Sequence, residues 1–348
     1  AFNPNEARVQ LPDYKSYTHL QFLEELKDIL DVKNPIRKVD AREGEKSLEE
    51  IAGNYVFTAD NFVKMVIILL KIRAKIPVIM MGETGCGKTS LIRKLSEMIN
   101  NGDCTMKIKN IHAGVTDRDI IKFINDEVIK EAEELEKSEE EIRQKHEALK
   151  EIYFPKKLWV FLDEINTCKS MGLISELMCK NTCQGKELPN NIVFIAACNP
   201  YRHREKGLSE KAGLDIKQAY KEIKNLNQKE IEKMQKAINS TLVYTVNPLP
   251  HSLLNFVFDF GNLTPEDEKR YIKSIISEPI ERLYKNKKEN ENLNEEDKKN
   301  IEENFKNMHN LAKKMISKAQ NFIRDKNGIS SVSLREIARF KIFYEFFY

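Results

Sequence analysis

The 348-residue sequence has no long apolar run, no marked excess of charge of one sign and only six cysteines. A membrane-spanning helix needs about 20 consecutive apolar residues. The longest apolar run, near Val66–Leu70, is followed at once by Lys71 and then Arg73, so we expect no membrane span. The 57 Lys and Arg against 54 Asp and Glu leave a net charge of +3. This near-neutral balance removes the usual electrostatic argument for a nucleic-acid partner.

The cysteines are too few for a disulfide scaffold, and their positions favour a reducing, cytoplasmic compartment. Cys179 and Cys183 are four residues apart and can share a helix face, but a zinc site needs two more ligands at matching spacing, and none is close by. The sequence starts at Ala1 without a basic segment or an apolar segment of the kind that signal peptides contain. We therefore expect no signal peptide and interpret the chain as a piece of a longer protein.

Short apolar runs bounded by Gly, Pro or charged residues alternate with helical patterns along the chain. These runs predict buried strands at 78–81, 106–111, 158–162, 192–197 and 242–246. Near-continuous apolar strands that alternate with helices imply a parallel sheet covered on both faces. The sequence therefore predicts an α/β fold with a five-stranded parallel sheet.

Three parts follow from this pattern. We expect an N-terminal linking segment at 1–56, a large α/β subdomain at 57–250 and an all-helical subdomain, the lid, at 251–348. The stretches 126–150 and 285–303 are dominated by charges of mixed sign. Such composition indicates solvated helices or flexible insertions.

Residues 82–89 match the phosphate-loop pattern G-x-x-x-x-G-K-[ST] at every specified position, between a predicted strand and a helical stretch. Glycines let backbone N–H groups turn toward phosphate oxygens, and the following helix start adds partial positive charge. Lys88 is expected to reach the β- and γ-phosphates, and Thr89 to ligate Mg²⁺. The residues expected around the phosphates are Gly82, Glu83, Thr84, Gly85, Cys86, Gly87, Lys88, Thr89 and Ser90.

Polar residues also follow two of the predicted strands, where open α/β sheets bind ligands. Asp163 and Glu164 close the strand 158–162; we expect Asp163 to hold Mg²⁺ and Glu164 to activate the attacking water as a general base. Asn199 ends the strand 192–197, and its amide is expected to bond the γ-phosphate or the water. The alternative for Asn199 is a turn that Asn-Pro initiates.

A late helix carries a candidate arginine. Ser333 and Glu336 form a capping box that predicts a helix start and places Arg335 in its first turn. Arg335 is either a phosphate contact from the lid or a solvent-facing residue of an amphipathic helix, and the spacing does not decide between them.

Together these motifs resemble those of the AAA+ ATPases, and most closely the dynein-like AAA+ modules of mysterin-like giant ubiquitin ligases. The resemblance rests on residues 57–65, 76–89, 161–167, 185–191, 196–202, 247–254 and 332–335. It implies a ring of several AAA+ modules with ATP and Mg²⁺ as cofactors. It also implies Asn199 as a sensor on the fourth strand, Arg335 as a sensor on the lid, and ubiquitin transfer elsewhere in the parent protein. The chain has no RING-type array of Cys and His.

One position departs from the related modules, which resemble one another in an arginine finger soon after a Leu-Pro pair. Here Leu249-Pro250 is followed by His251 and no arginine, with Arg202 and Arg204 as candidate substitutes. We therefore expect an ATPase that needs an arginine from another module. The alternatives are a structural nucleotide-binding module with negligible turnover, a GTPase, and a nucleic-acid motor that the charge balance disfavours.

Overall fold

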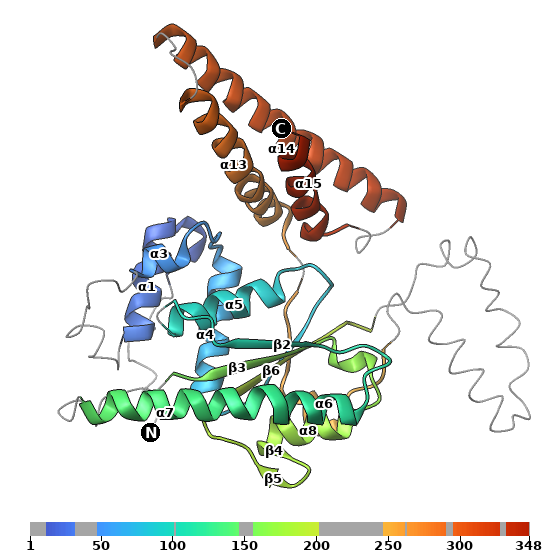
Figure 1. Cartoon of the computed structure of the whole chain (residues 1–348). Coiled ribbons are helices and arrows are strands. Elements are labelled where there is room, and N and C mark those ends of the chain that lie inside the picture. Colours follow the sequence, from blue (N-terminus) through green and yellow to red (C-terminus); the bar gives the residue numbers. More distant parts are fainter. Residues whose placement is uncertain are drawn as a thin grey trace, which may run out of the picture.

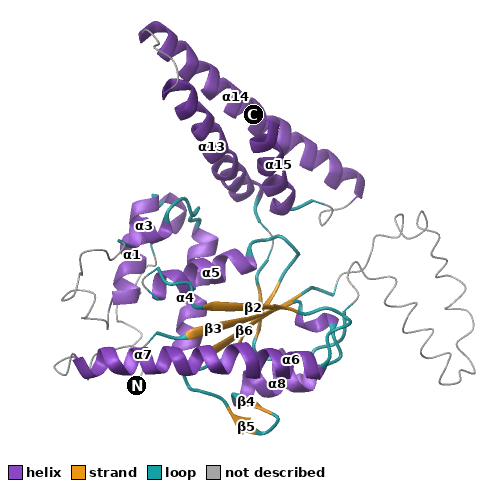
Figure 2. Ribbon diagram, viewed as in Figure 1, coloured by secondary structure: helices purple, strands orange, loops and turns teal. Residues whose placement is uncertain are grey.

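The computed structural model describes residues 12–31, 47–100, 102–145, 156–201, 246–261, 263–289, 295–327 and 332–347. In this part of the chain, a parallel sheet with helices on both faces is joined to a helical subdomain that projects from one side (Figures 1 and 2).

The main sheet has five strands in the order β2-β3-β6-β1-β7, and every neighbouring pair is parallel. The five-stranded parallel sheet predicted from the sequence is therefore confirmed. Its strands are β1 (Val78–Met81), β2 (Met106–Asn110), β3 (Leu158–Asp163), β6 (Ile192–Cys198) and β7 (Val257–Asp259).

The fifth strand differs from the one expected at 242–246, of which residues 242–245 lie outside the described residues. β7 (Val257–Asp259) instead pairs with β1. The sheet thus continues past residue 250, and the first helix of the lid begins at Pro265. β7 has too few residues to show an alternating pattern, and it directly follows the short helix α12 (His251–Leu254).

Each face of the sheet has its own apolar core because successive side chains of a strand point to opposite faces. Trp159 and Phe161 of β3 pack with α1 (His19–Asp31), α4 (Ala59–Arg73) and α5 (Lys88–Ile99). The intervening β3 residues pack on the other face with α6 (Asp117–Phe123), α7 (Lys130–Lys145) and α8 (Met171–Lys180). Figure 1 shows the two helix layers on either side of the sheet.

The expected linking segment contributes to this core. Phe22 and Leu26 of α1 are buried, as is Ile51 of α3 (Leu48–Ala52). Helix α1 therefore packs as part of the sheet subdomain, while residues 1–11 and 32–46 lie outside the described residues.

The charged stretch 126–150 is helical as far as residue 145 and includes a π-helical turn, Ile124–Ile129, ahead of α7. Val128 and Ala132 are buried on its inner side. Mixed charge along its outer side therefore accompanies a helix that covers one face of the sheet.

A small antiparallel hairpin, β4 (Thr182–Cys183) with β5 (Lys186–Glu187), follows α8.

The described part of the lid consists of the helices α13 (Pro265–Glu289), α14 (Glu295–Asn327) and α15 (Leu334–Phe347). Ile272, Ile276 and Ile337 form its small buried core. Because α13 and α14 run on through 285–289 and 295–303, the second charged stretch is helical in its described part. None of the described helices is long and apolar enough to cross a membrane.

Candidate functional site: the phosphate loop and the lid

The phosphate loop joins β1 to α5 and contains two glycines in left-handed backbone conformations. Gly85 has φ +75° and Gly87 has φ +96°, a region that residues with a Cβ rarely adopt. Gly87 occupies the N-cap of α5, and no side chain caps the first N–H groups of that helix. These N–H groups and the helix dipole make the turn a site for anions.

The Lys88 side chain is folded back onto its own loop and is only 7% exposed. Its Nζ donates to the carbonyl oxygens of Gly82 at 2.7 Å and Glu83 at 2.8 Å. It also lies 3.8 Å from the Cys86 Sγ, and burial raises the pKa of that thiol. The lysine charge is therefore held inside the loop, where a phosphate would meet it.

The acidic pair lies at the carboxyl end of β3, next to the start of α5. The Thr89 hydroxyl is 3.5 Å from the Asp163 Oδ2. Glu164 joins Asp163 to the short helix Ile165–Thr167, and it adopts a left-handed backbone conformation with φ +57°. Its N–H donates to Asp163 Oδ1 at 3.0 Å. A strained non-glycine backbone at a strand end is a common feature of functional sites.

Asn199 is fixed by a second asparagine that the sequence analysis gave no role. The Asn166 side chain accepts from the Asn199 N–H at 3.0 Å and donates to the Asn199 carbonyl at 2.8 Å. The Asn166 carbonyl in turn accepts from the Asn247 N–H at 2.6 Å. Asn166 is fully buried. This network fixes the ends of β3 and β6 relative to each other.

A cavity of about 620 Å³ opens over the phosphate loop, between the sheet and the lid. A cavity of this size accommodates a nucleotide-sized ligand. Of the residues expected at the site, those that line it are Thr84, Gly85, Cys86, Gly87, Lys88, Thr89, Ser90, Asp163, Glu164 and Arg335.

The lid closes the cavity through the start of α15. Ser333 lies directly against Gly85: a Cβ built on Gly85 would be 2.4 Å from the Ser333 Oγ and 2.5 Å from its Cβ. Ser333 caps this helix, because its N–H donates to Glu336 Oε2 at 2.7 Å and its Oγ accepts from the Arg335 N–H at 3.2 Å. Arg335 is exposed and borders the cavity beside Leu334. The predicted helix start thus brings the lid arginine to the phosphate loop.

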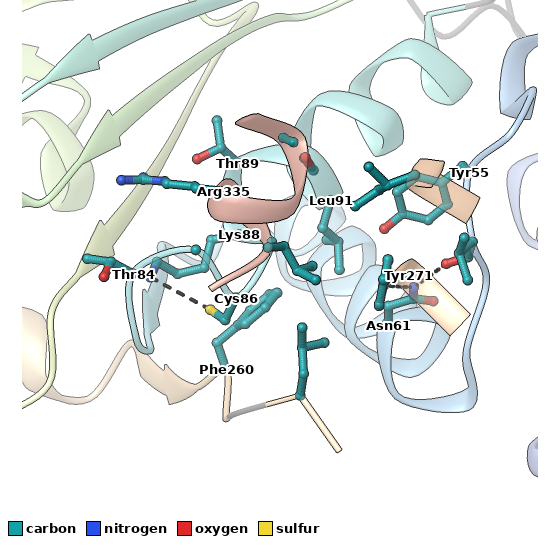
Figure 3. Close-up of a pocket in the computed structure, with 18 of the residues that line it drawn as sticks. Tyr55, Asn61, Thr84, Cys86, Lys88, Thr89, Leu91, Phe260, Tyr271 and Arg335 are labelled. Atoms are coloured by element: carbon teal, nitrogen blue, oxygen red, sulfur yellow. Dashed lines mark hydrogen bonds between the residues drawn. The ribbon is translucent and has the colours of Figure 1, made fainter. Parts of the chain in front are cut away.

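Three further side chains line the opposite end of the cavity from the lid arginine (Figure 3). The Asn61 side chain donates to the Tyr271 hydroxyl of α13 at 2.6 Å and to the Val56 carbonyl at 2.7 Å. Tyr55 lies beside Tyr271, and burial raises the pKa of both phenols. Two aromatic rings therefore line this end of the cavity, where the flat ring of a base could pack.

Some of the residues expected at the site are not among those that line the cavity. Gly82 and Glu83 contribute the carbonyls that hold Lys88 rather than cavity wall. Asn199 is 4% exposed and is not among the residues that line the cavity. Arg202 and Arg204 lie outside the described residues.

The two cysteines considered for zinc are differently placed. Cys179 is exposed on α8, whereas Cys183 is buried in β4. The described part of the chain holds no group of three or more His, Cys, Asp or Glu side chains suited to a metal ion.

The site also contains residues that the sequence analysis missed, namely Asn61, Asn166 and Tyr271. A local signal existed for Asn61, which stands three residues after Thr58 at the start of a helical pattern and completes a capping box. Tyr271 has no such signal, because its partner is 210 positions away in the sequence.

The geometry agrees with comparisons to known proteins. Residues 55–202 match the family model of the RNF213 AAA domain. The E3 ubiquitin-protein ligase rnf213-beta of Danio rerio is 36% identical over 233 residues, which cover 65% of this chain and 4% of that protein. RNF213 of Mus musculus is 34% identical over 243 residues, covering 68% of this chain. RNF213 of Homo sapiens is 34% identical over 236 residues, covering 66%.

The chain spans about 4% of the length of each of these relatives. The similarity thus concerns one module and leaves most of each relative unmatched. The matched segment contains the phosphate loop, the acidic pair and Asn199, all on the sheet described above. The chain therefore contains an RNF213-like AAA module.

Proposed function

We propose that this chain is a Mg-ATP-binding and ATP-hydrolysing AAA+ module. The observation that supports this most strongly is the convergence of three elements on one cavity. The phosphate loop with Lys88, the acidic pair after β3, and Arg335 of the lid all line the same 620 Å³ space. Loop, carboxylates and a lid arginine are the groups that phosphoryl transfer from a nucleotide requires.

Nucleotide binding would change the contacts of Lys88. Its ammonium now donates to two loop carbonyls, and it would exchange these for oxygens of the β- and γ-phosphates. The N–H groups at the start of α5 would donate to the same phosphates. Ser333 lies against Gly85, so the start of α15 would shift as the phosphates enter.

The residues beside Lys88 fit a magnesium ion. Thr89 offers a hydroxyl and Asp163 a carboxylate within 3.5 Å of each other, and oxygen donors of this kind are the ligands that Mg²⁺ prefers. When bound, Mg²⁺ would neutralise charge on the phosphate oxygens. Glu164 would orient the attacking water and accept its proton. Asn199, once the site is assembled, would hydrogen-bond the γ-phosphate or that water.

In the parent protein, we propose that nucleotide state moves the lid relative to the sheet and is passed to neighbouring AAA+ modules of a ring. Arg335 would read the γ-phosphate from the lid, and an arginine for catalysis would come from another module. The relatives are named as E3 ubiquitin-protein ligases. We propose the same setting here, in the cytoplasm, with ubiquitin transfer outside this chain.

Binding is tested first because it does not need an arginine from another module. Isothermal titration with ATP, ADP and GTP in Mg²⁺ should give selective adenine-nucleotide binding that Lys88→Ala abolishes. Lys306→Ala is the matched control, because that ammonium pairs with exposed Glu302 on the lid. No binding by a folded chain would contradict the proposed nucleotide site.

Hydrolysis is tested separately through Glu164. A preparation that turns over ATP should lose turnover in Glu164→Gln by about 100-fold or more, while ATP binding is retained. Equal turnover in the variant and the parent would remove Glu164 from the mechanism and leave the binding proposal standing.

A second candidate function is a nucleotide-binding brace with negligible turnover. The observation in its favour is that, among the described residues that line the cavity, Arg335 is the only arginine. Dissociation of bound nucleotide distinguishes the two functions. A brace would release nucleotide extremely slowly, and its nucleotide content would be unaffected by Glu164→Gln.

A further inference from the structure

A second, smaller cavity lies at the opposite end of the sheet strands from the phosphate loop. It has a volume of about 160 Å³. Its wall includes Lys75 and Pro77, just before β1, and Lys157, just before β3. Since the strands are parallel, these residues mark the amino-terminal edge of the sheet. The two cavities share no lining residue.

Two lysines give this small cavity a positive charge. Lys157 is half-buried, and burial together with the charge of Lys75 lowers the pKa of Lys157. Among the described residues that line the cavity there is no Asp or Glu. The neighbouring Lys156 differs, because its Nζ pairs with Asp103 at 2.6 Å. Two lysines that line one cavity, the exposed Lys75 and the half-buried Lys157, without a carboxylate among the described lining residues, favour an anion there.

The main chain at each lysine has a defined conformation. The Lys157 carbonyl accepts from the Thr105 hydroxyl at 2.9 Å and from the Asn100 side chain at 3.2 Å. Lys75 ends the α4 segment in a left-handed conformation with φ +55°, a position that helices usually give to glycine. A lysine there carries a conformational cost that glycine would avoid.

Apart from Asn181 and Asn190, the rest of the described wall is apolar in residue type. Much of it is buried, as Leu177 and Ile192 are, whereas Ile76 is exposed. A short hydrocarbon chain would cover the apolar surface that remains accessible and remove it from water, which inorganic phosphate would not do. At about 160 Å³ the space is well below the roughly 300–1,000 Å³ of pockets for drug-sized ligands.

We propose that this cavity binds a small organic carboxylate, whose charge is held by Lys75 and Lys157 and whose hydrocarbon body lies against the apolar wall. This site is independent of the proposed nucleotide site. It requires a ligand with one anionic end and a short apolar body, and it excludes nucleotides by size.

The test uses isovalerate as the probe, with acetate and inorganic phosphate as comparison anions. Methyl NMR of the whole chain should show saturable shifts at Ile192 and Val193, which line the cavity. Isovalerate should bind more tightly than acetate or phosphate. Lys157→Met and Lys75→Met should each weaken it about tenfold, because each removes a charged hydrogen-bond donor.

Lys156→Met is the matched control, since it removes an adjacent ammonium that pairs with Asp103 outside the cavity. It should leave isovalerate affinity unchanged. Methionine keeps the length of the side chain, and unchanged methyl spectra without ligand verify that each variant is folded. Absence of saturable shifts with isovalerate would overturn the proposal. Equal weakening by Lys156→Met, or equal affinity for phosphate, would also overturn it.

Discussion

The side-chain nitrogen of Asn61 donates to the Tyr271 hydroxyl at 2.6 Å and, with its other hydrogen, to the Val56 carbonyl at 2.7 Å. The oxygen of the same amide accepts from the Thr58 N–H at 2.9 Å. One buried amide therefore joins the first turn of α4, the cavity wall at Val56 and the lid helix α13. Any displacement of α13 at Tyr271 changes a contact of the cavity wall.

Asn61→Ala should lower the free energy of unfolding by about 2–3 kcal/mol, because it removes half of a capping box and leaves the Val56 carbonyl without its partner. Tyr271→Phe keeps the capping box and the Val56 contact but removes the hydroxyl that bonds Asn61 and Tyr55, and it should cost about 1 kcal/mol. Urea unfolding followed by fluorescence of Trp159, the one tryptophan in the sequence, measures both. A cost for Tyr271→Phe as large as that for Asn61→Ala would contradict this division.

Gly85→Ala and Gly87→Ala form a matched pair. Both positions have positive φ, so each alanine should cost about 1–2 kcal/mol in backbone strain. Only at Gly85 would the new methyl group meet Ser333, whereas nothing lies within 4 Å at Gly87. Gly85→Ala should therefore also displace the lid.

Small-angle X-ray scattering without nucleotide measures this difference. The radius of gyration should rise in Gly85→Ala and stay unchanged in Gly87→Ala. Adding Ser333→Gly to Gly85→Ala removes the obstructing side chain and should reverse the rise. Identical scattering from the two single variants would mean that Ser333 does not hold the lid at the loop.

The lid is also stabilised by a two-fold contact between Arg324 and Glu268. The two guanidinium nitrogens of Arg324 donate to the Glu268 carboxylate at 2.7 and 2.5 Å, and this bond raises the pKa of Arg324. Arg324→Ala should destabilise the lid by about 2–3 kcal/mol, because Glu268 keeps its charge in a mostly buried position. Helical circular dichroism should record this loss, while Trp159 fluorescence in the sheet should change little.

Lys306→Ala is the control for that prediction. Its pair with Glu302 has side chains that are 72% and 55% exposed, and exposed pairs contribute about 0.5 kcal/mol or less. If both variants unfolded the lid equally, burial of the Arg324 pair would not be the source of its stability.

The β4–β5 hairpin should loosen in acid. The Gly185 N–H donates to Glu176 Oε1 at 2.6 Å, and this bond holds the pKa of Glu176 below its ordinary value of 4.5. The ionised carboxylate therefore stabilises the hairpin above the ordinary pKa, and this contribution is lost as pH falls through the lower value of the folded state. Hydrogen exchange at Gly185 should accelerate in that window, and Glu176→Gln should remove the dependence on pH.

Sequence motifs predicted those structural elements whose determining residues all lie within one short segment. The phosphate loop from Gly82 to Thr89 combines a fixed spacing with a buried strand before it and a helix after it. The acidic pair follows a run in which each of the residues 158–162 is apolar and buried. Ser333 and Glu336 predicted the start of α15 at Leu334, because a capping box is a local hydrogen-bond pattern.

Features that depend on distant residues could not be found in this way. The strand β7 has three residues and no alternation of its own, and it is a strand because β1 lies beside it. Asn166 gave no signal, since its amide acts on Asn199, 33 positions away. The contacts of Lys88 with the Gly82 and Glu83 carbonyls also depend on the path of the loop rather than on residue type.

Because the lid helices α13 and α14 are long and extend away from the cavity, a small rotation of the lid at the cavity would produce a larger movement at their far ends. Helix α13 has 25 residues, so at the usual rise per residue its length is about 37 Å. Figure 1 shows α13 and α14 extending together away from the sheet. A rotation of about 10° at Tyr271 would carry the far end of α13 at Glu289, about 27 Å away, through about 5 Å. A change of one or two ångströms at the cavity would thus become a displacement several times larger at the far end of the lid.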